Sequence, residues 1–324
     1  EFKIFSDVVP DPPIGKIVLG VKALLDYQPE VLIAVGGGSA IDASKAIREF
    51  AMTTEGYPKI PLIAIPTTSG TGSEVTSFAV ITDPERHIKY PLISPSLLPD
   101  EAILDAELVR SVPPHITADT GMDVFTHALE AFVSINENEF SSALAEKAIQ
   151  IVGSHLLRTY YDGNDMDARK KMHSASCLAG LAFNSAGLGL NHGMAHALGA
   201  TFHIPHGRAN AMLLPHIIQY NSNINEHSKS QRSYPQVVER YSTIARNLGL
   251  NSYNEIMTVR SLANWVQFML KELDMPLSIS QIGTISKEDY FAAIPHMADE
   301  ALADNCTKNN PRKVTRANVI ELYK

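Results

Sequence analysis

The sequence predicts an α/β fold in two parts: an N-terminal domain with a Rossmann-like, mostly parallel sheet over residues 1–111, and an all-helical C-terminal domain over residues 112–324. Three observations support this prediction. The chain of 324 residues is longer than one core of ordinary size, which favours two domains. Short apolar runs alternate with helical stretches in the first third. These β-type runs stop at Pro113 and Pro114, which cannot continue the interior of a strand.

The predicted strands are continuous apolar runs rich in β-branched residues, a pattern typical of strands buried on both faces. The stretch IDASKAIREFAM, residues 41–52, follows the first run with helical spacing. Strand, helix and strand in this rhythm predict a mostly parallel sheet. The four predicted strands are VLIAV (31–35), PLIAI (61–65), FAVITD (78–83) and EAILD (101–105).

The second part shows helical spacing in one segment after another, with no internal repeat. The predicted helices cover residues 120–134, 142–161, 168–183, 236–249, 259–273, 287–303 and 316–324. The first residue is Glu1, and the opening EFKIFSDVVPDPP is typical of a strand that leads into a loop. We therefore expect the N-terminal part of the first domain, and any targeting segment in it, to be missing from this chain.

Composition narrows the class of protein. Apolar residues make up 45% of the chain, charged residues 19%, and no apolar run approaches the ~20 residues that span a bilayer. A net charge of −8 without a basic block argues against nucleic acid as a partner. Two cysteines, Cys177 and Cys306, suit a reducing compartment and form no disulfide framework. We expect a cytoplasmic protein that binds neither nucleic acid nor membrane.

A glycine loop follows the first predicted strand. In VGGGSAIDASKAI, Gly36, Gly37 and Gly38 let the backbone approach a ligand, and the helix that follows offers free N–H groups to a pyrophosphate. The alternative is a tight turn in which Ser39 caps the helix and Asp42 completes a capping box. Because Asp42 would repel a phosphate, capping or a ribose hydroxyl is its expected role.

A hydroxyl-rich loop follows the second predicted strand. AIPTTSGTGSEVTS offers Thr67, Thr68 and Thr71, with further serines and glycines, although Thr71 and Glu74 could form only a helix cap. Two such loops at the carboxyl ends of successive parallel strands predict a dinucleotide site. Lys89 is the nearest cation for a phosphate or a ribose, the alternative being a solvated surface lysine.

Asp123 and His127 are four residues apart on a predicted helix, so both side chains leave the same face. A simple Asp–His hydrogen bond is one explanation for this pair. The stretch LNHGMAHALGATFHIPHG favours another, because it holds His192, His196, His203 and His206 among small and apolar residues. One carboxylate with two or three imidazoles suits Fe²⁺ or Zn²⁺ better than Ca²⁺ or Mg²⁺.

Spacing alone does not choose the ligands among these histidines. His192 and His196 stand four apart, as the two histidines of the H-E-x-x-H metalloprotease motif do. Gly193 follows the first of them, however, so the general base of a zinc protease is missing.

Four motifs in this order resemble those of the group III, iron-dependent (metal-containing) alcohol dehydrogenases, and the resemblance runs over the whole chain. They are GGGSAIDASKA, IPTTSGTGSE, ADTGMDVFTHALEAF and GLGLNHGMAHALGATFHIPHGRANAMLLPH, followed by NPRKVTRANVIELY near the end. Within the family, the chain is most similar to the 1-propanol dehydrogenases of propanediol utilisation and to the ethanolamine-utilisation alcohol dehydrogenases. Family members begin with a further strand and helix that this chain lacks.

The resemblance implies a role for each motif. The metal ligands fall on Asp123, His127, His192 and His206, with Fe²⁺ as the expected metal and Zn²⁺ as the alternative. His196 falls beside the metal as a non-ligand and a plausible proton carrier, the alternative being packing, and Cys306 falls on a substrate-lining position. We expect His203 to be structural. The positions expected to bind NAD(H), or less favourably NADP(H), are Gly37, Gly38, Ser39, Asp42, Thr67, Thr68, Thr71 and Lys89.

The resemblance further implies an enzyme that interconverts a short-chain primary alcohol, such as 1-propanol or ethanol, and its aldehyde by hydride transfer. We expect a homodimer or a higher homo-oligomer in the cytoplasm or inside a bacterial microcompartment. One alternative is a relative of dehydroquinate synthase or glycerol dehydrogenase that acts on a polyol or a phosphorylated sugar acid, for which Arg208 is the only basic residue near the histidines. The others are a metal-dependent hydrolase and a non-catalytic scaffold.

Overall fold

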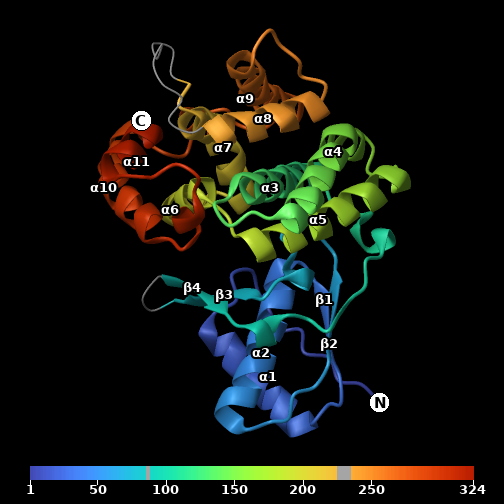
Figure 1. Cartoon of the computed structure of the whole chain (residues 1–324). Coiled ribbons are helices and arrows are strands. Elements are labelled where there is room, and N and C mark those ends of the chain that lie inside the picture. Colours follow the sequence, from blue (N-terminus) through green and yellow to red (C-terminus); the bar gives the residue numbers. More distant parts are fainter. Residues whose placement is uncertain (85–87, 225–234) are drawn as a thin grey trace. The chain divides into compact units, whose positions relative to one another are not determined.

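The computed structural model describes residues 1–84, 88–224 and 235–324, without the side chains of residues 88, 89 and 235. These residues form two compact units, Glu1–Ser111 and Val112–Lys324. The first unit combines helices with short strands, and the second is helical (Figure 1). None of the described helices is long and apolar enough to cross a membrane.

The sheet of the first unit has three parallel strands. β1 (Leu32–Gly36) pairs with β2 (Leu62–Pro66), and β2 pairs with β5 (Glu101–Ala102), in the order β1-β2-β5. Helix α1 (Ile14–Tyr27) packs against α2 (Gly38–Glu55), and α2 also packs against β1 and β2. This is the predicted α/β arrangement, in which a helix follows a strand directly. The prediction that the first strand is buried on both faces is wrong, because Ile33 and Val35 of β1 are 56% and 57% exposed and only Ala34 is buried.

The predicted strand over residues 78–83 forms, but it does not join the parallel sheet. It is β3 (Phe78–Asp83), which pairs antiparallel with β4 (Ile88–Ile93), a strand that the sequence did not predict. Only residues 84–87 separate the two strands, and so short a connection joins antiparallel neighbours but not parallel ones. The predicted strand at 101–105 is also shorter, since β5 covers only Glu101–Ala102.

The second unit contains nine helices among its described residues, with a short 3-10 turn, Cys306–Asn309, before the last of them. Seven of the nine correspond to predicted helices, whereas α6 and α7, in the histidine-rich part, were not predicted as helices. The bounds are α3 (Pro114–Val133), α4 (Glu139–Tyr161), α5 (Met166–Ala186), α6 (Leu190–Phe202), α7 (His206–Ser222), α8 (Pro235–Asn247), α9 (Glu255–Glu272), α10 (Lys287–Ala303) and α11 (Arg316–Tyr323).

Helix α3 lies at the centre of the second unit. It packs against α4, α5 and α7 (Figure 1), and nearly every residue from Thr117 to Val133 is buried. Pro113 precedes it and Pro114 is its first residue, a position where the missing N–H costs nothing. A second apolar core, which includes Met194, Met212 and Met297, joins α6, α7, α10 and α11. Because α3 is buried on nearly all sides, its polar side chains, Asp123 and His127 among them, lie in the interior of the unit.

Candidate functional site

Helix α3 carries Asp123 and His127 on one face, one turn apart. Each residue is only 4% exposed, and Oδ2 of Asp123 lies 3.8 Å from Nδ1 of His127. The ring of His127 stacks on Phe183 of α5, with 4.6 Å between the ring centroids. The pair is therefore fixed in the interior of the helical unit, where a carboxylate is costly unless partners surround it.

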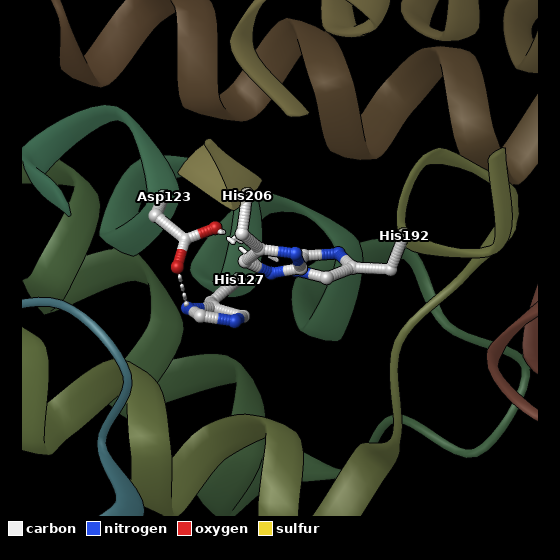
Figure 2. A group of neighbouring side chains, drawn as sticks. All are labelled: Asp123, His127, His192 and His206. Carbon is white, nitrogen blue, oxygen red and sulfur yellow. Dashed lines mark ion pairs between the residues drawn. The ribbon is translucent and has the colours of Figure 1, made fainter. Parts of the chain in front are cut away.

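Helices α6 and α7 bring His192 and His206 to the same carboxylate. Oδ1 of Asp123 lies 3.4 Å from Nε2 of His206 and 3.8 Å from Nε2 of His192. Figure 2 shows the carboxylate with one oxygen directed to His127 and the other to the remaining two rings. One potential ligand atom from each of the four residues lies within 4.8 Å of the other three. The structure thus brings together the four residues expected to bind metal.

The amide of Asn210, one turn after His206 on α7, shows that the donors converge on one point. Its Nδ2 lies 2.8 Å from Oδ1 of Asp123 and 3.1 Å from Nε2 of both His192 and His206. A single electropositive group thus meets three of the four candidate donor side chains at once. One carboxylate and three imidazoles also form a donor set that Fe²⁺ and Zn²⁺ accept. The residues present fit a divalent metal ion.

Gly207 explains how α7 can begin so close to α3. A Cβ added at Gly207 would lie 2.0 Å from the backbone oxygen of Asp119 and 3.1 Å from Cβ of Asp123. The next residue, Arg208, donates two hydrogen bonds to the Asp119 carboxylate, at 3.0 and 3.1 Å. Asp119 therefore neutralises Arg208, the basic residue nearest the histidines in the sequence, which weakens the alternative of a phosphorylated substrate.

Glu130 is a further buried carboxylate beside the four residues. Its Oε2 lies 2.5 Å from Nδ1 of His192, and its side chain is 4% exposed. Burial raises the pKa of Glu130 to about 8, while backbone N–H groups of Asn191, Gly189 and His192 act to lower it. A cation held by Nε2 of His192 would act in the same direction as those N–H groups.

His196 lies beside the four residues and outside the group of four. Its ring stacks on that of His206, with 5.2 Å between centroids, and its side chain is 43% exposed. Nδ1 of His196 lies 2.8 Å from Oδ2 of Asp304, and Cys306 completes a second group of neighbouring donors. Burial and the Asp304 carboxylate raise the pKa of the Cys306 thiol. His203 ends α6 as its C-cap, in the left-handed region at φ 54°.

The two loops expected to bind the dinucleotide lie side by side in the first unit. They follow β1 and β2, and the N–H of Thr67 donates to the oxygen of Gly36 at 2.9 Å. A Cβ at Gly37 would lie 3.3 Å from Thr68, and one at Gly38 would lie 2.7 Å from Cγ2 of Thr71. Backbone and hydroxyl groups of both loops therefore meet at the carboxyl ends of neighbouring parallel strands, where such sheets bind nucleotides.

The alternative in which Ser39 and Asp42 form a capping box is wrong. Gly37 is the N-cap of α2, and no side chain caps this end. Asp42 instead accepts hydrogen bonds from Oγ of Ser73, at 2.5 Å, and from the N–H of Val80, at 2.9 Å. Its carboxylate thus ties the hydroxyl-rich loop to α2, because one partner, Ser73, begins the 3-10 turn Ser73–Val75 and the other, Val80, lies in β3.

Two further sequence interpretations concern the hydroxyl-rich loop and β4. Oγ1 of Thr71 accepts the N–H of Ser73 at 3.2 Å, so the side chain takes part in the turn. Lys89 lies in β4 opposite Thr82, but its side chain is outside the described part of the structure. The sequence did not predict roles for Asn210, Glu130 and Asp304, each of which hydrogen-bonds a histidine of the site. Glu130 and Asp304 are far from their histidines in the sequence, so no local pattern connects them. Asn210 lies one helical turn after His206, and this spacing is the one local signal that could have indicated it.

The two candidate sites together indicate a metal-dependent dehydrogenase. The α/β unit has paired glycine and hydroxyl loops, and the helical unit gathers one aspartate and three histidines. The chain belongs to the iron-containing alcohol dehydrogenase family. The family model described as iron-containing alcohol dehydrogenase matches residues 1–106, and the C-terminal model of the same family matches residues 117–324. The protein is therefore an oxidoreductase that interconverts alcohols and aldehydes.

Individual relatives agree with this assignment. The chain is 45% identical to 1-propanol dehydrogenase PduQ of Salmonella typhimurium, over 99% of this chain and 84% of that one. It is 38% identical to an NADPH-dependent butanol dehydrogenase of Clostridium saccharobutylicum, over 100% and 83% of the two chains. Its structure matches that of a 1,3-propanediol oxidoreductase with a TM-score of 0.90 and 32% identity, over 100% and 84% of the chains.

Proposed function

We propose that this enzyme reduces a short-chain aldehyde such as propanal to its primary alcohol with NADH, and catalyses the reverse oxidation, with Fe²⁺ held by Asp123, His127, His192 and His206. The observation that carries the metal assignment is the convergence of four donor side chains from three helices within 4.8 Å of one another. Zn²⁺ is the alternative metal, because both ions accept this donor set.

The metal would supply a Lewis acid that polarises the substrate oxygen and lowers the pKa of the alcohol, and the nicotinamide would supply the hydride carrier. The chain contributes position and charge. Asp123 would balance part of the cation charge in a buried place, and the three imidazoles would fix the position of the cation. Such prior fixing of reacting groups removes much of the entropic barrier to reaction.

His196 is the proposed proton carrier. Asp304 engages its Nδ1, which leaves Nε2 on the other side of the ring available to a substrate hydroxyl. The half-exposed ring lies against His206, and so beside the proposed metal centre. It can therefore pass a proton between that centre and solvent, the work of a general acid and base.

The two loops of the α/β unit are the proposed dinucleotide site. The N–H groups at the start of α2, near Gly37, Gly38 and Ser39, would bind the pyrophosphate. The hydroxyls of Thr67, Thr68 and Thr71 would add polar contacts from the neighbouring loop. Asp42 would act indirectly, since its carboxylate holds Ser73 and Val80 in place. Lys89 stays a proposed phosphate or ribose contact.

The relatives support the proposed substrate and the proposed location. The similarity to a 1-propanol dehydrogenase supports propanal and 1-propanol as substrates, whereas the butanol dehydrogenase relative is named as NADPH-dependent. The resemblance to enzymes of propanediol utilisation supports a bacterial microcompartment as an alternative to the cytoplasm. We also propose that the chain forms a homodimer or a higher homo-oligomer, which sedimentation would test.

The test starts with protein purified anaerobically and analysed for iron and zinc. The purified enzyme is then assayed with ethanal, propanal and butanal, each with NADH and with NADPH, by the loss of reduced-nicotinamide absorbance. We expect about one metal ion per chain and the highest kcat/KM with propanal and NADH. Metal-replete protein that oxidises neither cofactor with any of these aldehydes would contradict the proposal.

A further inference from the structure

Glu130 occupies a place that the proposed catalytic cycle does not use. It lies on α3 three residues after His127, is 3% exposed, and contributes no atom to the group of four donors. Nevertheless, both of its oxygens are engaged. Oε1 accepts the N–H of Asn191 at 2.7 Å, and Oε2 accepts the N–H of His192 at 3.3 Å while lying 2.5 Å from Nδ1 of the same residue.

This contact determines which nitrogen of His192 carries the proton. A neutral imidazole has one N–H and one lone pair, and the hydrogen bond at one nitrogen sets the role of the other. A cation near Nε2 of His192 would favour the ionised form of Glu130, in which both oxygens are acceptors only, so Nδ1 of His192 is then the donor toward Oε2. The lone pair is then on Nε2, which faces Oδ1 of Asp123 at 3.8 Å and the amide of Asn210 at 3.1 Å.

The same carboxylate fixes the helix that carries His192. Gly189 is the N-cap of α6 and provides no capping side chain, so the first N–H groups of the helix need partners from elsewhere. Glu130 satisfies two of them, at Asn191 and His192. A Cβ at Gly189 would lie 2.7 Å from Oε1 of Glu130, so the close approach of α6 to α3 depends on a glycine there.

We propose that Glu130 is a positioning residue that sets the metal affinity of the centre through His192, by fixing its tautomer, its ring orientation and the start of α6. This inference rests on the proposed ligand set. Carboxylate partners of histidine ligands commonly change metal affinity by about 10- to 100-fold when they are removed.

Glu130→Gln tests the proposal because glutamine has the same shape but only one acceptor oxygen. It cannot accept hydrogen bonds from donors that face both oxygens, so either Asn191 or His192 loses its partner. The measured quantity is the dissociation constant for Co²⁺ or Zn²⁺, obtained by competition with a chelator on the full chain. We expect a 10- to 100-fold weaker constant and an altered visible spectrum of the Co²⁺ form.

Glu74→Gln is the matched control. Glu74 is likewise a 3% exposed glutamate, but it lies in the α/β unit, outside the group of donors. Its replacement should leave the metal dissociation constant and the Co²⁺ spectrum unchanged. Thermal unfolding of each variant in chelator measures the loss of stability without metal. If Glu130 only caps α6, this stability falls while the metal affinity stays unchanged.

The outcomes separate the inference from the proposed function. A wild-type metal constant in Glu130→Gln overturns the inference, whatever its thermal stability. Wild-type protein that binds no metal at all overturns the proposed ligand set as well. If the glutamine variant does not fold, Glu130→Asp replaces it, because its shorter carboxylate withdraws from Nδ1 and should also weaken binding. In a His192→Ala background, Glu130→Gln should cost no further metal affinity.

Discussion

The helical unit builds its candidate metal centre from buried side chains, whereas the α/β unit builds its candidate cofactor site from backbone and small hydroxyl groups. Asp123, His127 and His192 are at most 4% exposed and lie on helices packed around a common interior. The loops around Gly38 and Thr71 lie at strand ends and are only partly buried. Loss of one side-chain donor should therefore abolish most metal binding, whereas a change in one of the loops should weaken cofactor binding only in part.

The largest effect is expected from His206→Ala, which removes one donor of the four. The remaining three donors leave the cation poorly held, so metal content and propanal reduction should fall together. Loss of a Lewis acid worth several kcal/mol corresponds to a fall in rate of about a thousandfold or more. The measurements are metal per chain and kcat/KM. Full metal occupancy in this variant would remove His206 from the ligand set.

A smaller effect is expected from His196→Ala, which leaves all four donors in place. Metal content should stay at the wild-type level, while kcat for propanal reduction falls by about a hundredfold, the lower range for loss of general acid–base catalysis. His203→Asn is the control, because asparagine also accepts the left-handed conformation of this C-cap and should leave kcat unchanged. An unaltered kcat in His196→Ala would assign His196 to packing alone.

Regular patterns predicted the parts of the fold in which neighbours along the chain decide the structure. The strands at β1 and β2 and the pairing of Asp123 with His127 on one helix follow from local periodicity. Helices α6 and α7 escaped prediction because Gly193, Gly207 and Pro215 are poor helix residues. Packing explains the two glycines: a Cβ at Gly193 would lie 2.1 Å from Oγ1 of Thr307, as tight as the contact at Gly207.

Strand β4 and the residues that support the site were missed for related reasons. Pro91 within β4 argues against a strand, but in a two-stranded ribbon with a free edge its missing N–H is tolerated. Glu130 and His192 are 62 residues apart, and His196 and Asp304 are 108 apart. Such contacts depend on how helices pack, which local periodicity does not encode.

A graded effect in the α/β unit is expected from Gly38→Ala. The added Cβ would lie 2.7 Å from Cγ2 and 3.0 Å from Oγ1 of Thr71, so the two loops must separate slightly. We expect KM for NADH to rise about tenfold, equivalent to about 1.4 kcal/mol, with unchanged metal content. Adding Thr71→Ser removes Cγ2 and should recover part of the loss. A wild-type KM in Gly38→Ala would show that the contact between the loops does not control cofactor binding.

The last effect concerns stability rather than activity and involves Lys45, a fully buried residue of α2. Its Nζ donates to the backbone oxygens of Thr76 and Phe78 at 2.8 and 2.7 Å. Burial lowers the pKa of Lys45 to about 8, from 10.5, although Asp42 and Glu74 act to raise it. Between these two values the unfolded chain holds a proton that the folded protein has released, so this group makes the free energy of unfolding rise with pH.

The comparison with Lys45→Met isolates this contribution. Unfolding in urea at about pH 8 and about pH 10 gives the stability of wild type relative to the variant, and we expect that difference to grow at the higher pH. Metal content should be the same in both proteins, since Lys45 belongs to the α/β unit. A stability difference that does not change with pH would mean that Lys45 stays charged throughout. In that case, a permanently charged ammonium group holds the backbone oxygens of Thr76 and Phe78.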